Sequence, residues 1–459
     1  MSNQDLMEKI VGLAKRRGFV YPGSEIYGGL ANSWDYGPLG VELKNNIKQL
    51  WWKRFVQQRS NMVGIDAALV MNPKVWEASG HVATFSDPLI EDTVTHERFR
   101  LDHLLEEAGV NVAGMDLAAM SDKIKELNLK SPKGNTLGEP KKFNLMLKTF
   151  LGPAEEAANV AYFRPETAQA MFVQFKSVLN TARKTLPFGI AQQGKAFRNE
   201  ITPGNFIFRT REFEQMEIEY FIPVPKSDEE WNEHFMMWHQ AMKDWMQNDL
   251  GLDLSHVHEL EVPAEDRAHY SKRTVDFEYE FPFGIKELYG LAYRTDFDLQ
   301  NHQKHSGENL EYTDPQTNEK FLPHVIEPTW GVDRSVLAVL CEHYKEEGEG
   351  DSKRVYLALP PKLAPYKAAV FPLLKNKPEL VEKAKGIYKD LQEHFMVAWD
   401  DRGNVGKRYY SQDEIGTPFG ITVDFQTLED NTVTIRHRDT TKQERISVDE
   451  LSAFILKHV

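Results

Sequence analysis

The sequence predicts an α+β chain in which antiparallel strands flanked by helices form residues 1–350 and a smaller α/β domain forms residues 351–459. Three observations predict it. The stretch Phe188–Ile222 alternates apolar and polar side chains on both sides of a loop with proline and glycine, as two neighbouring strands do. The segment Glu346–Lys353 (EEGEGDSK) is charged and lacks apolar periodicity, which is typical of a linker. Strand-like and helix-like segments alternate after it, which favours an α/β domain.

In chain order, the first element outside this plan is an insertion. Leu101–Lys148 has a modest apolar helical face followed by the polar loop Lys130–Lys142. We expect a helical insertion over about residues 101–160. The period-two pattern then predicts a strand over Phe206–Ile222.

The next segment predicts one long helix. Ser227 and Glu230 have the spacing of a capping box, and Gly251 ends the apolar period. The helix carries an aromatic-rich stripe at helical spacing, which we interpret as core rather than as a binding surface. Its members are Trp231, Phe235, Trp238, Met242 and Trp245.

The C-terminal segment predicts a strand that begins at Arg354 and an amphipathic helix over Pro378–His394. Two further strands are expected over Gly420–Phe425 and Thr432–Arg438.

Composition bounds the class of protein. The chain has 459 residues with 41% apolar and 27% charged residues, an ordinary globular mixture with room for two or three domains. No apolar run approaches the length of a membrane span, and the N-terminus lacks the apolar stretch of a signal peptide. A single cysteine, Cys341, excludes an internal disulfide and a Cys-rich zinc site, so we expect a cytoplasmic protein.

The net charge of −14 does not favour a nucleic-acid partner at first sight. The charge is uneven, however, because residues 351–459 carry 17 basic and 16 acidic residues. The C-terminal domain is therefore the better candidate for contacts with phosphates.

Two apparent motifs are misleading. Gly189–Ala196 (GIAQQGKA) nearly matches a phosphate-binding loop, but Ala196 stands where the Mg²⁺-binding hydroxyl belongs. His302 and His305 have no cysteine or carboxylate at a spacing that would complete a metal site.

The two strands within Phe188–Ile222 carry an unusual polar face. Arg198 and Glu200 share one face of the first strand. The second strand places Phe213, Gln215, Glu217 and Glu219 on one face. A face that mixes arginine, glutamates and an aromatic ring indicates a binding surface better than a merely solvated one.

These residues carry a resemblance to a known family. The RNE and FRTREFEQME text resembles motif 2 of class II aminoacyl-tRNA synthetases, and GVDR before a helix over Ser335–His343 resembles motif 3. Text beginning at Asp35, with the helix through Phe55, resembles motif 1. Four sequence segments are similar to those of glycyl-tRNA synthetases of the homodimeric type. The matching segments are EIYGG (Glu25–Gly29), WDYGPLG (Trp34–Gly40), YFRPETAQ (Tyr162–Gln169) and IEPTWGVDR (Ile326–Arg334).

The resemblance implies a class II antiparallel-sheet catalytic domain and an anticodon-binding domain at residues 351–459. It implies an enzyme that activates glycine with ATP and transfers it to the 3′ end of tRNA(Gly), and a homodimer built through motif 1. Mg²⁺ is expected with ATP. Zinc is not, because Thr93–Glu97 stands where some relatives carry cysteines.

The resemblance also implies an ATP site. The attack of the glycine carboxylate on the α-phosphate needs no general base, but it needs positive charge, so Arg198 and Arg334 are the expected catalytic residues. Phe213 is expected to stack on adenine and Glu200 to accept from its amino group, with Glu287 as the carboxylate for Mg²⁺. The expected ATP-binding residues are Arg198, Asn199, Glu200, Phe208, Arg209, Phe213, Glu287, Leu288, Gly331 and Arg334.

Glycine recognition requires exclusion, because apolar contacts gain only about 1–3 kcal/mol per methylene and cannot select the smallest amino acid. The expected solution is a tight site whose carboxylates surround the ammonium group. Arg100, with Arg294 as an alternative, is expected to hold the substrate carboxylate. The expected glycine-binding residues are Arg100, Glu166, Phe213, Glu217, Glu327, Thr329 and Gly331.

In the C-terminal domain, Arg436 and Arg438 are expected to contact the anticodon. Two alternatives stay open. One is a class II synthetase of another specificity, such as proline or threonine, which the acidic PET and EPT text does not favour. The other is a non-catalytic paralogue that only binds tRNA, which the presence of Arg198, Glu200 and Arg334 does not favour.

Overall fold

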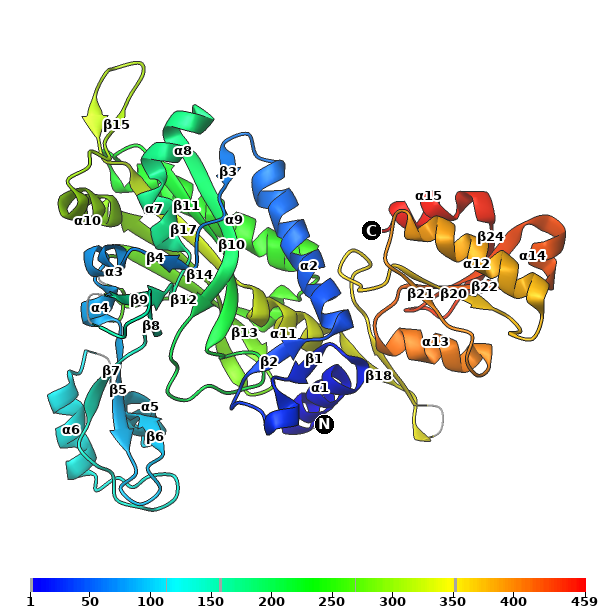
Figure 1. Cartoon of the computed structure of the whole chain (residues 1–459), viewed down its shortest axis with the longest axis horizontal. Helices are drawn as coiled ribbons and strands as arrows, with labels where there is room; N and C mark the ends of the chain where they lie inside the picture. The colour runs from blue at the N-terminus through cyan, green and yellow to red at the C-terminus, as the bar shows by residue number, and fades with distance from the viewer. Residues whose placement is uncertain (1–2, 113, 157–158, 269, 351–352) are drawn as a thin grey trace.

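A seven-stranded sheet forms the middle of the N-terminal part of the computed structural model, which describes residues 3–112, 114–156, 159–268, 270–350 and 353–459 (Figure 1). The strand order is β12–β13–β14–β17–β11–β10–β3, and every neighbouring pair is antiparallel except β10 and β3. The expected antiparallel catalytic sheet is therefore confirmed. The strands are β3 (Met62–Gly64), β10 (Phe188–Phe197), β11 (Glu212–Ile222), β12 (Val257–Glu261), β13 (Arg273–Phe281), β14 (Gly284–Thr295) and β17 (His324–Gly331).

The two strands expected from the polar face are β10 and β11, but β10 ends at Phe197, before Arg198 and Glu200, so the prediction that these two residues belong to the first strand is wrong. β11 also begins later than the alternation predicts. The prediction that the strand starts at Phe206 is wrong. Asn205 and Phe206 have positive φ, and the backbone N–H groups of Gly204 and Arg209 each donate to the carbonyl of the other, so this segment is a turn. Phe206 is buried in the core, which explains why the apolar pattern continues outside the strand. The glycines of GIAQQGKA lie within β10 and form no phosphate loop.

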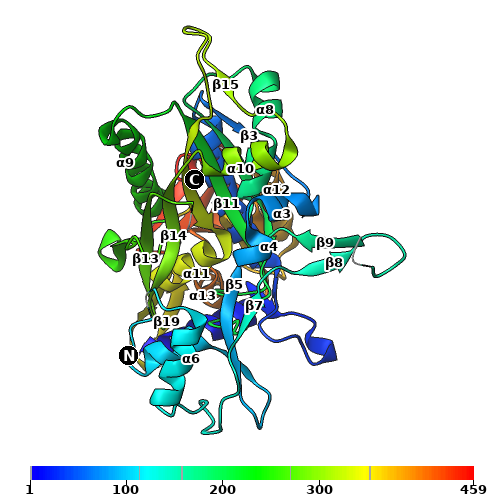
Figure 2. The same ribbon diagram turned by 90° about the vertical axis from the view of Figure 1, so that its left-hand side faces the viewer.

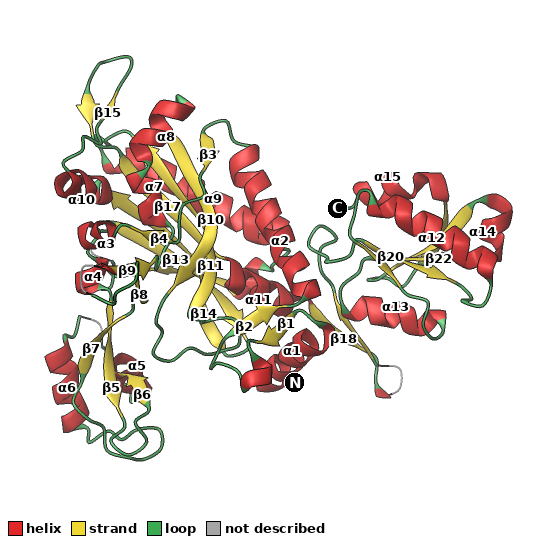
Figure 3. Cartoon of the chain, viewed as in Figure 1, coloured by secondary structure: helices red, strands yellow, loops and turns green. Residues whose placement is uncertain are grey.

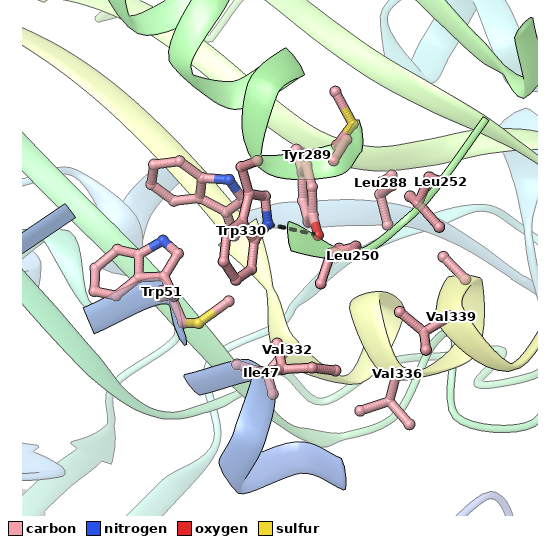
Figure 4. Packing of buried hydrophobic residues seen from close by; sticks show 14 of the residues in the cluster. Ile47, Trp51, Leu250, Leu252, Leu288, Tyr289, Trp330, Val332, Val336 and Val339 are labelled. Carbon is pink, nitrogen blue, oxygen red and sulfur yellow. Dashed lines mark hydrogen bonds between the residues drawn. The ribbon is translucent and has the colours of Figure 1, made fainter. Parts of the chain in front are cut away.

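Helices pack against the sheet and form one large core with it (Figure 3). In Figure 4, Trp51 of α2 (Pro38–Trp52) lies beside Trp330 at the end of β17, and Val336 and Val339 of α11 (Val332–His343) close the cluster. The ring centroids of Trp51 and Trp330 are 5.4 Å apart. This packing fixes the end of β17 and the start of α11, where the motif 3 residues lie.

The aromatic stripe belongs to α9 (Asp228–Asp244) and the π-helical turn Trp245–Asp249, and all five of its members are buried, so its interpretation as core is confirmed. The predicted capping box is wrong. Ser227 makes no side-chain cap, and the Glu230 carboxylate accepts from the backbone N–H of Lys226 instead of that of Ser227.

The insertion is a separate α+β lobe, seen in cyan in Figure 1 and again at the bottom of Figure 2. The prediction of a purely helical insertion starting at residue 101 is wrong, because three short strands precede and follow the helices. They are β5 (Ser86–Glu91), β6 (Arg98–Arg100) and β7 (Lys141–Asn144), in the order β6–β5–β7, with α5 (Leu101–Glu107) and α6 (Leu117–Glu126) packed on them. The lobe has its own apolar cluster around Ile90, Leu105 and Ile124.

The turn of the lobe's β5–β6 hairpin is organised by Asp92, which is fully buried. Its carboxylate accepts hydrogen bonds from the backbone N–H groups of Val94 and Thr95 and from the side chains of Ser131 and Asn135. Two turns are thereby joined by one carboxylate.

The C-terminal part contains a five-stranded sheet in the order β21–β20–β22–β23–β24. β20 (Ala368–Pro372) is parallel to β21 (Val397–Trp399) and β22 (Phe419–Val423), while β23 (Thr432–His437) and β24 (Gln443–Ser447) are antiparallel. The expected α/β character and the helix α12 (Pro378–Gln392) are confirmed. The helices α13 (Val405–Glu414), α14 (Phe425–Asp430) and α15 (Leu451–Leu456) complete the domain.

The connection between the two parts is more than a flexible linker. Glu346 and Glu347 belong to β18 (Tyr344–Glu347), which pairs with β19 (Arg354–Leu357). Leu359 and Leu363 then pack into the core of the N-terminal part. Asp351 and Ser352 of the predicted linker lie outside the described residues.

The described helices include none whose length and apolar character would allow it to cross a bilayer.

Candidate active site

A pocket with a cavity volume of about 380 Å³ opens on one face of the seven-stranded sheet. This size is in the range of sites that enclose a nucleotide-sized ligand. Most of the residues expected at the ATP and glycine sites line it. They are Glu166, Arg198, Glu200, Phe208, Arg209, Phe213, Glu217, Glu287, Leu288, Glu327, Thr329, Gly331 and Arg334.

The strand register explains why residues distant in sequence meet here. Glu217 of β11 is paired with Thr329 of β17, Thr329 with Gly290 of β14, and Gly290 with Asp276 of β13. Side chains at directly paired positions point to the same face of a sheet. A polar row therefore crosses four strands, and Gly290 leaves its middle without a side chain.

The expected catalytic arginines both line the pocket, in the part that we call the arginine end, and each is anchored to a backbone carbonyl. Arg334 Nη1 donates to the Glu287 carbonyl at 3.0 Å and pairs with the Glu287 carboxylate at 3.1 Å, and its guanidinium lies 4.6 Å from the Phe208 ring centroid. Arg198 Nε donates to the Pro165 carbonyl at 3.1 Å. A guanidinium carries five N–H donors, so each anchored arginine keeps others for an anion.

The aromatic ring of Phe213 lies beside Arg198, with 5.3 Å between the guanidinium carbon and the ring centroid. Glu200 is buried near the same place and pairs with Arg209 at 3.7 Å. A flat ring next to a buried hydrogen-bond acceptor is a suitable surface for a purine base.

A second carboxylate, which the sequence analysis missed, lies near Glu287. Asp276 lines the pocket, and burial, aided by the charges of Glu287 and Glu278, raises the pKa of Asp276 to about 7. Arg334 holds the pKa of Glu287 below its usual range although burial opposes it. Period-two alternation in RTVDFEYEF was the signal that placed Asp276 on a strand face.

The three expected glutamates also line the pocket, in the part that we call the glutamate end, and each has different partners. Glu166 pairs with His81 Nε2 at 3.3 Å and accepts from Gln169 Nε2 at 3.0 Å. Burial alone would raise the pKa of Glu166, but His81 and Arg294 outweigh it and hold that pKa well below its usual range. The first of these partners was not expected from the sequence.

Glu217 accepts hydrogen bonds from two threonines, Thr329 at 2.9 Å and Thr167. Thr167 was missed, although it stands in the PET segment next to Glu166. Two hydroxyl donors fix the Glu217 carboxylate without neutralising it, so its charge stays available to a cation.

Glu327 pairs with Arg294 at 2.6 Å, and Arg294 also donates to both carboxylate oxygens of Asp298. Arg294 is buried, stacks 3.7 Å from the Tyr270 ring centroid and is not among the pocket-lining residues. Its expected contact with the substrate carboxylate therefore requires it to share donors that these carboxylates already use.

The structure does not bring two other expected residues into the pocket. Arg100 belongs to the insertion lobe and pairs with Asp87 at 2.8 Å and with Asp102, so it is not placed to hold a glycine carboxylate. Asn199 donates its backbone N–H to the Leu145 carbonyl and does not line the pocket. Both positions follow from the insertion lobe, whose attachment the sequence did not reveal.

The three motif segments meet at Asp333, the neighbour of Arg334. Its carboxylate accepts from Tyr36 Oη at 2.5 Å, from Lys44 Nζ at 3.5 Å and from the backbone N–H of Glu214 at 2.7 Å. One buried carboxylate thus joins α2, β11 and α11 and fixes the position of the arginine that follows it.

The expected anticodon contacts of Arg436 and Arg438 are contradicted by their burial. Arg436 makes two hydrogen bonds to Asp413, and Arg438 donates to the carbonyls of Gly416 and Leu359. Their side chains hold the C-terminal sheet to neighbouring segments. β23 lies between β22 and β24 and is not an edge strand.

An antiparallel sheet with paired arginines at the motif 2 and motif 3 positions defines the catalytic core of a class II aminoacyl-tRNA synthetase. Residues 153–344 match the family described as "tRNA synthetase class II core domain (G, H, P, S and T)", and residues 367–458 match "Anticodon binding domain". The chain is 53% identical to the glycine–tRNA ligase of Alkaliphilus oremlandii, over 99% of this chain and 99% of that protein. It is 52% identical to that of Geobacillus thermodenitrificans, over 99% of this chain and 97% of that protein. The chain belongs to the glycine–tRNA ligase family.

Proposed function

We propose that this chain activates glycine with ATP to glycyl-adenylate and then transfers glycine to the 3′ end of tRNA(Gly). The observation that carries the proposal is that one pocket is lined by two anchored arginines at its arginine end and by three glutamates at its glutamate end. Phe213 and Glu217 are four residues apart on β11, which is about 13 Å along a strand. This span suits an extended glycyl-adenylate with its adenine at one end and its ammonium group at the other.

In the first step the glycine carboxylate attacks the α-phosphate and pyrophosphate leaves. Arg198 would stabilise the negative charge that develops at the α-phosphate, and Arg334 would hold the γ-phosphate. Phe213 would stack on adenine and Glu200 would accept from its amino group. The anchoring of both arginines supports this assignment, because preorganised donors need no rearrangement as charge develops.

Mg²⁺ would be held at the arginine end of the pocket by Glu287, with Asp276 beside it. The residues fit a hard dication, because two carboxylates that raise each other's cost of ionisation are relieved by a bound cation. The ion would neutralise phosphate charge when ATP is bound.

Glycine would be selected by the glutamate end of the pocket. The ammonium group would lie among Glu166, Glu217 and Glu327, and Thr329 would fill the space that a larger side chain requires. The hydrogen bond from Thr329 to Glu217 supports this role, since it ties the space-filling residue to the charge that attracts the substrate.

We also propose an assembly and a location, on the resemblance to the family. A homodimer formed through the motif 1 region is proposed, and exposed Ile26 and Tyr27 of EIYGG, both more than 85% accessible, support a covered surface there. A cytoplasmic location is proposed for the enzyme. The two substrates and tRNA(Gly) are its proposed partners.

For the anticodon we propose a different surface from Arg436 and Arg438. The loops after the parallel strands β20, β21 and β22 lie at one edge of the sheet, where ligands of parallel sheets bind. These loops and the helix turns that follow them expose basic and apolar side chains, which suits stacked single-stranded bases. The exposed residues are Leu374, Lys375, Lys377, Arg402, Lys407 and Phe425.

Changing Lys375 and Arg402 together to glutamate should raise the KM for tRNA by about tenfold or more, because each basic contact with nucleic acid contributes on the order of 1 kcal/mol. Glycine-dependent ATP–pyrophosphate exchange should not change, because the pocket is in the other domain. The measurement is charging of tRNA(Gly) with labelled glycine.

The matched control is Lys389→Glu, which makes the same kind of charge change on an exposed face of α12. If the double variant charges tRNA as well as this control, the anticodon lies elsewhere. If the unmodified chain fails to charge tRNA(Gly) at all, the proposed second step is wrong.

A further inference from the structure

Glu219 lies next to the proposed glycine site but has no role in the account so far. It is two residues after Glu217 on β11 and on the same face of the strand. Its side chain is fully buried, and neither carboxylate oxygen has a hydrogen-bond partner among the described residues. A buried polar group without a partner is rare and requires an explanation.

The environment of Glu219 is acidic. Carboxylate oxygens of Glu217, Glu219 and Glu327 lie within 4.8 Å of one another. Like charges at this separation disfavour the ionised form of at least one group. The three residues therefore share their ionisation, and we call them the glutamate cluster.

The partners of the glutamate cluster are unequal. Glu217 is held by two threonine hydroxyls and Glu327 by the Arg294 guanidinium, and both kinds of bond favour a carboxylate. Glu219 has neither. Burial raises the pKa of all three glutamates, and raises the pKa of Glu219 and of Glu327 well above the usual range. Glu219 alone of the three has no hydrogen-bond partner among the described residues, so it is the group that gains most from carrying a proton.

Other charged and titratable groups surround the glutamate cluster, and two of them, Arg164 and Arg294, are permanently cationic. Those that act on the cluster are Arg164 of the YFRPETAQ segment, Glu166 before α7, Tyr270 in the segment before β13, Arg294 of β14 and Asp298 of α10. His81 of α4 and His302 of α10 lie behind them, against Glu166 and Asp298. The balance of these charges is negative without a bound ammonium group, which agrees with a retained proton.

A second buried side chain near Glu217 also lacks hydrogen-bond partners among the described residues. Gln192 of β10 is directly paired with Glu217, is fully buried, and uses neither its amide nitrogen nor its amide oxygen. Buried hydrogen-bonding capacity next to Glu217, on Gln192 across the sheet and on Glu219 along β11, is thus left unsatisfied by the described residues.

We propose that glycine enters by cation exchange: the glutamate cluster holds one proton on Glu219 when the site is empty, and the glycine ammonium group displaces it. Glycine arrives as its zwitterion and keeps all its protons. The proton of the Glu219 carboxyl group leaves to solvent, and the cluster becomes fully ionised around the new cation. This inference rests on the proposed glycine site and identifies Glu219 as a positioning residue within it.

The direct test is calorimetry of glycine binding to the full-length protein at one pH in buffers of different ionisation enthalpy. The slope of the observed heat against that enthalpy counts the protons released. We expect a release approaching one proton per glycine for the unmodified chain and close to zero for Glu219→Gln, which resembles the protonated carboxyl group. No release from the unmodified chain, or equal release from both, would overturn the proposal.

Infrared difference spectroscopy provides a measurement that does not need the variant to bind glycine. The empty unmodified protein should show a protonated carboxyl band that glycine removes, and empty Glu219→Gln should lack that band. Glu414→Gln is a matched control, because it changes a half-buried glutamate of α13 in the other domain, and its band should be unchanged. A band that persists in Glu219→Gln would place the proton on another residue.

The proposal also predicts the pH profile of the glycine KM in ATP–pyrophosphate exchange. Release of one proton on binding means that affinity falls as pH falls, by up to about tenfold per pH unit while the cluster stays protonated. If exchange depends on glycine but the KM for glycine does not follow this profile, the proton release is refuted and the proposed function stands. If exchange does not depend on glycine, both the proton release and the proposed function are refuted.

Discussion

Replacing Arg334 or Arg198 with alanine should reduce glycine-dependent ATP–pyrophosphate exchange by two orders of magnitude or more. One lost donor to a developing negative charge costs about 3 kcal/mol or more in a preorganised site. Both guanidinium groups are fixed by backbone carbonyls, so each is already in position when the charge develops. The measurement is the exchange rate at saturating ATP and glycine.

Arg211→Ala is the matched control for this result. Arg211 is close to Arg209 in sequence but donates to the Ala31 carbonyl and does not line the pocket, so its loss should affect exchange little. Near-normal exchange in both Arg198→Ala and Arg334→Ala, with circular dichroism unchanged, would refute the assignment of the phosphate end.

Changing Glu217 to glutamine should raise the KM for glycine strongly while the KM for ATP stays near its original value. The substitution keeps the volume and one acceptor for the threonines, but it removes the charge that attracts the ammonium group. Alanine should stay excluded, because glutamine occupies the same space as glutamate and the shape of the glutamate end is retained. If ATP and glycine are affected equally, Glu217 has a structural role and the pocket division is wrong.

Changing Thr329 to glycine tests whether the shape of the same site excludes larger amino acids. It removes the side chain that closes the space beside Glu217, so alanine should become a measurable substrate while glycine loses some affinity. Thr434→Gly, in a strand of the C-terminal domain, controls for the cost of a glycine within a sheet.

Sequence alone predicted the residues of the pocket better than it predicted the path of the chain around them. Alternation along β10 and β11 placed Phe213 and Glu217 on one face, because a strand's period of two is a local property. The start of β11 was wrong, because Phe206 and Ile207 are apolar for packing and not for strand geometry. The pairing of Glu217 with Thr329 depends on the register of β17, which no local pattern reveals.

Errors about charged residues have a common cause. Arg436 and Arg438 looked like a basic surface, but each has buried acceptors that come from other segments. Arg100 looked available until the insertion lobe placed Asp87 and Asp102 beside it. Sequence shows that an arginine is present and does not show whether its partner is a substrate or a carboxylate of the same chain.

The missed residues follow the same rule. Glu219 lay on a strand face that the alternation had already identified, whereas the strand of Asp276 was not predicted, although RTVDFEYEF alternates. The importance of both residues depends on the charges that the fold brings near them. His81 is distant in sequence from Glu166, and its side chain meets that glutamate only after the helices are assembled.

The most direct test of glycine selection is ATP–pyrophosphate exchange with each of the twenty amino acids in turn, using the full-length protein and Mg²⁺. We expect exchange with glycine and none above background with alanine, serine, proline or threonine. Exchange that depends on another amino acid, or no exchange with any of them, would contradict the claim that the glutamate-lined end of this pocket selects glycine.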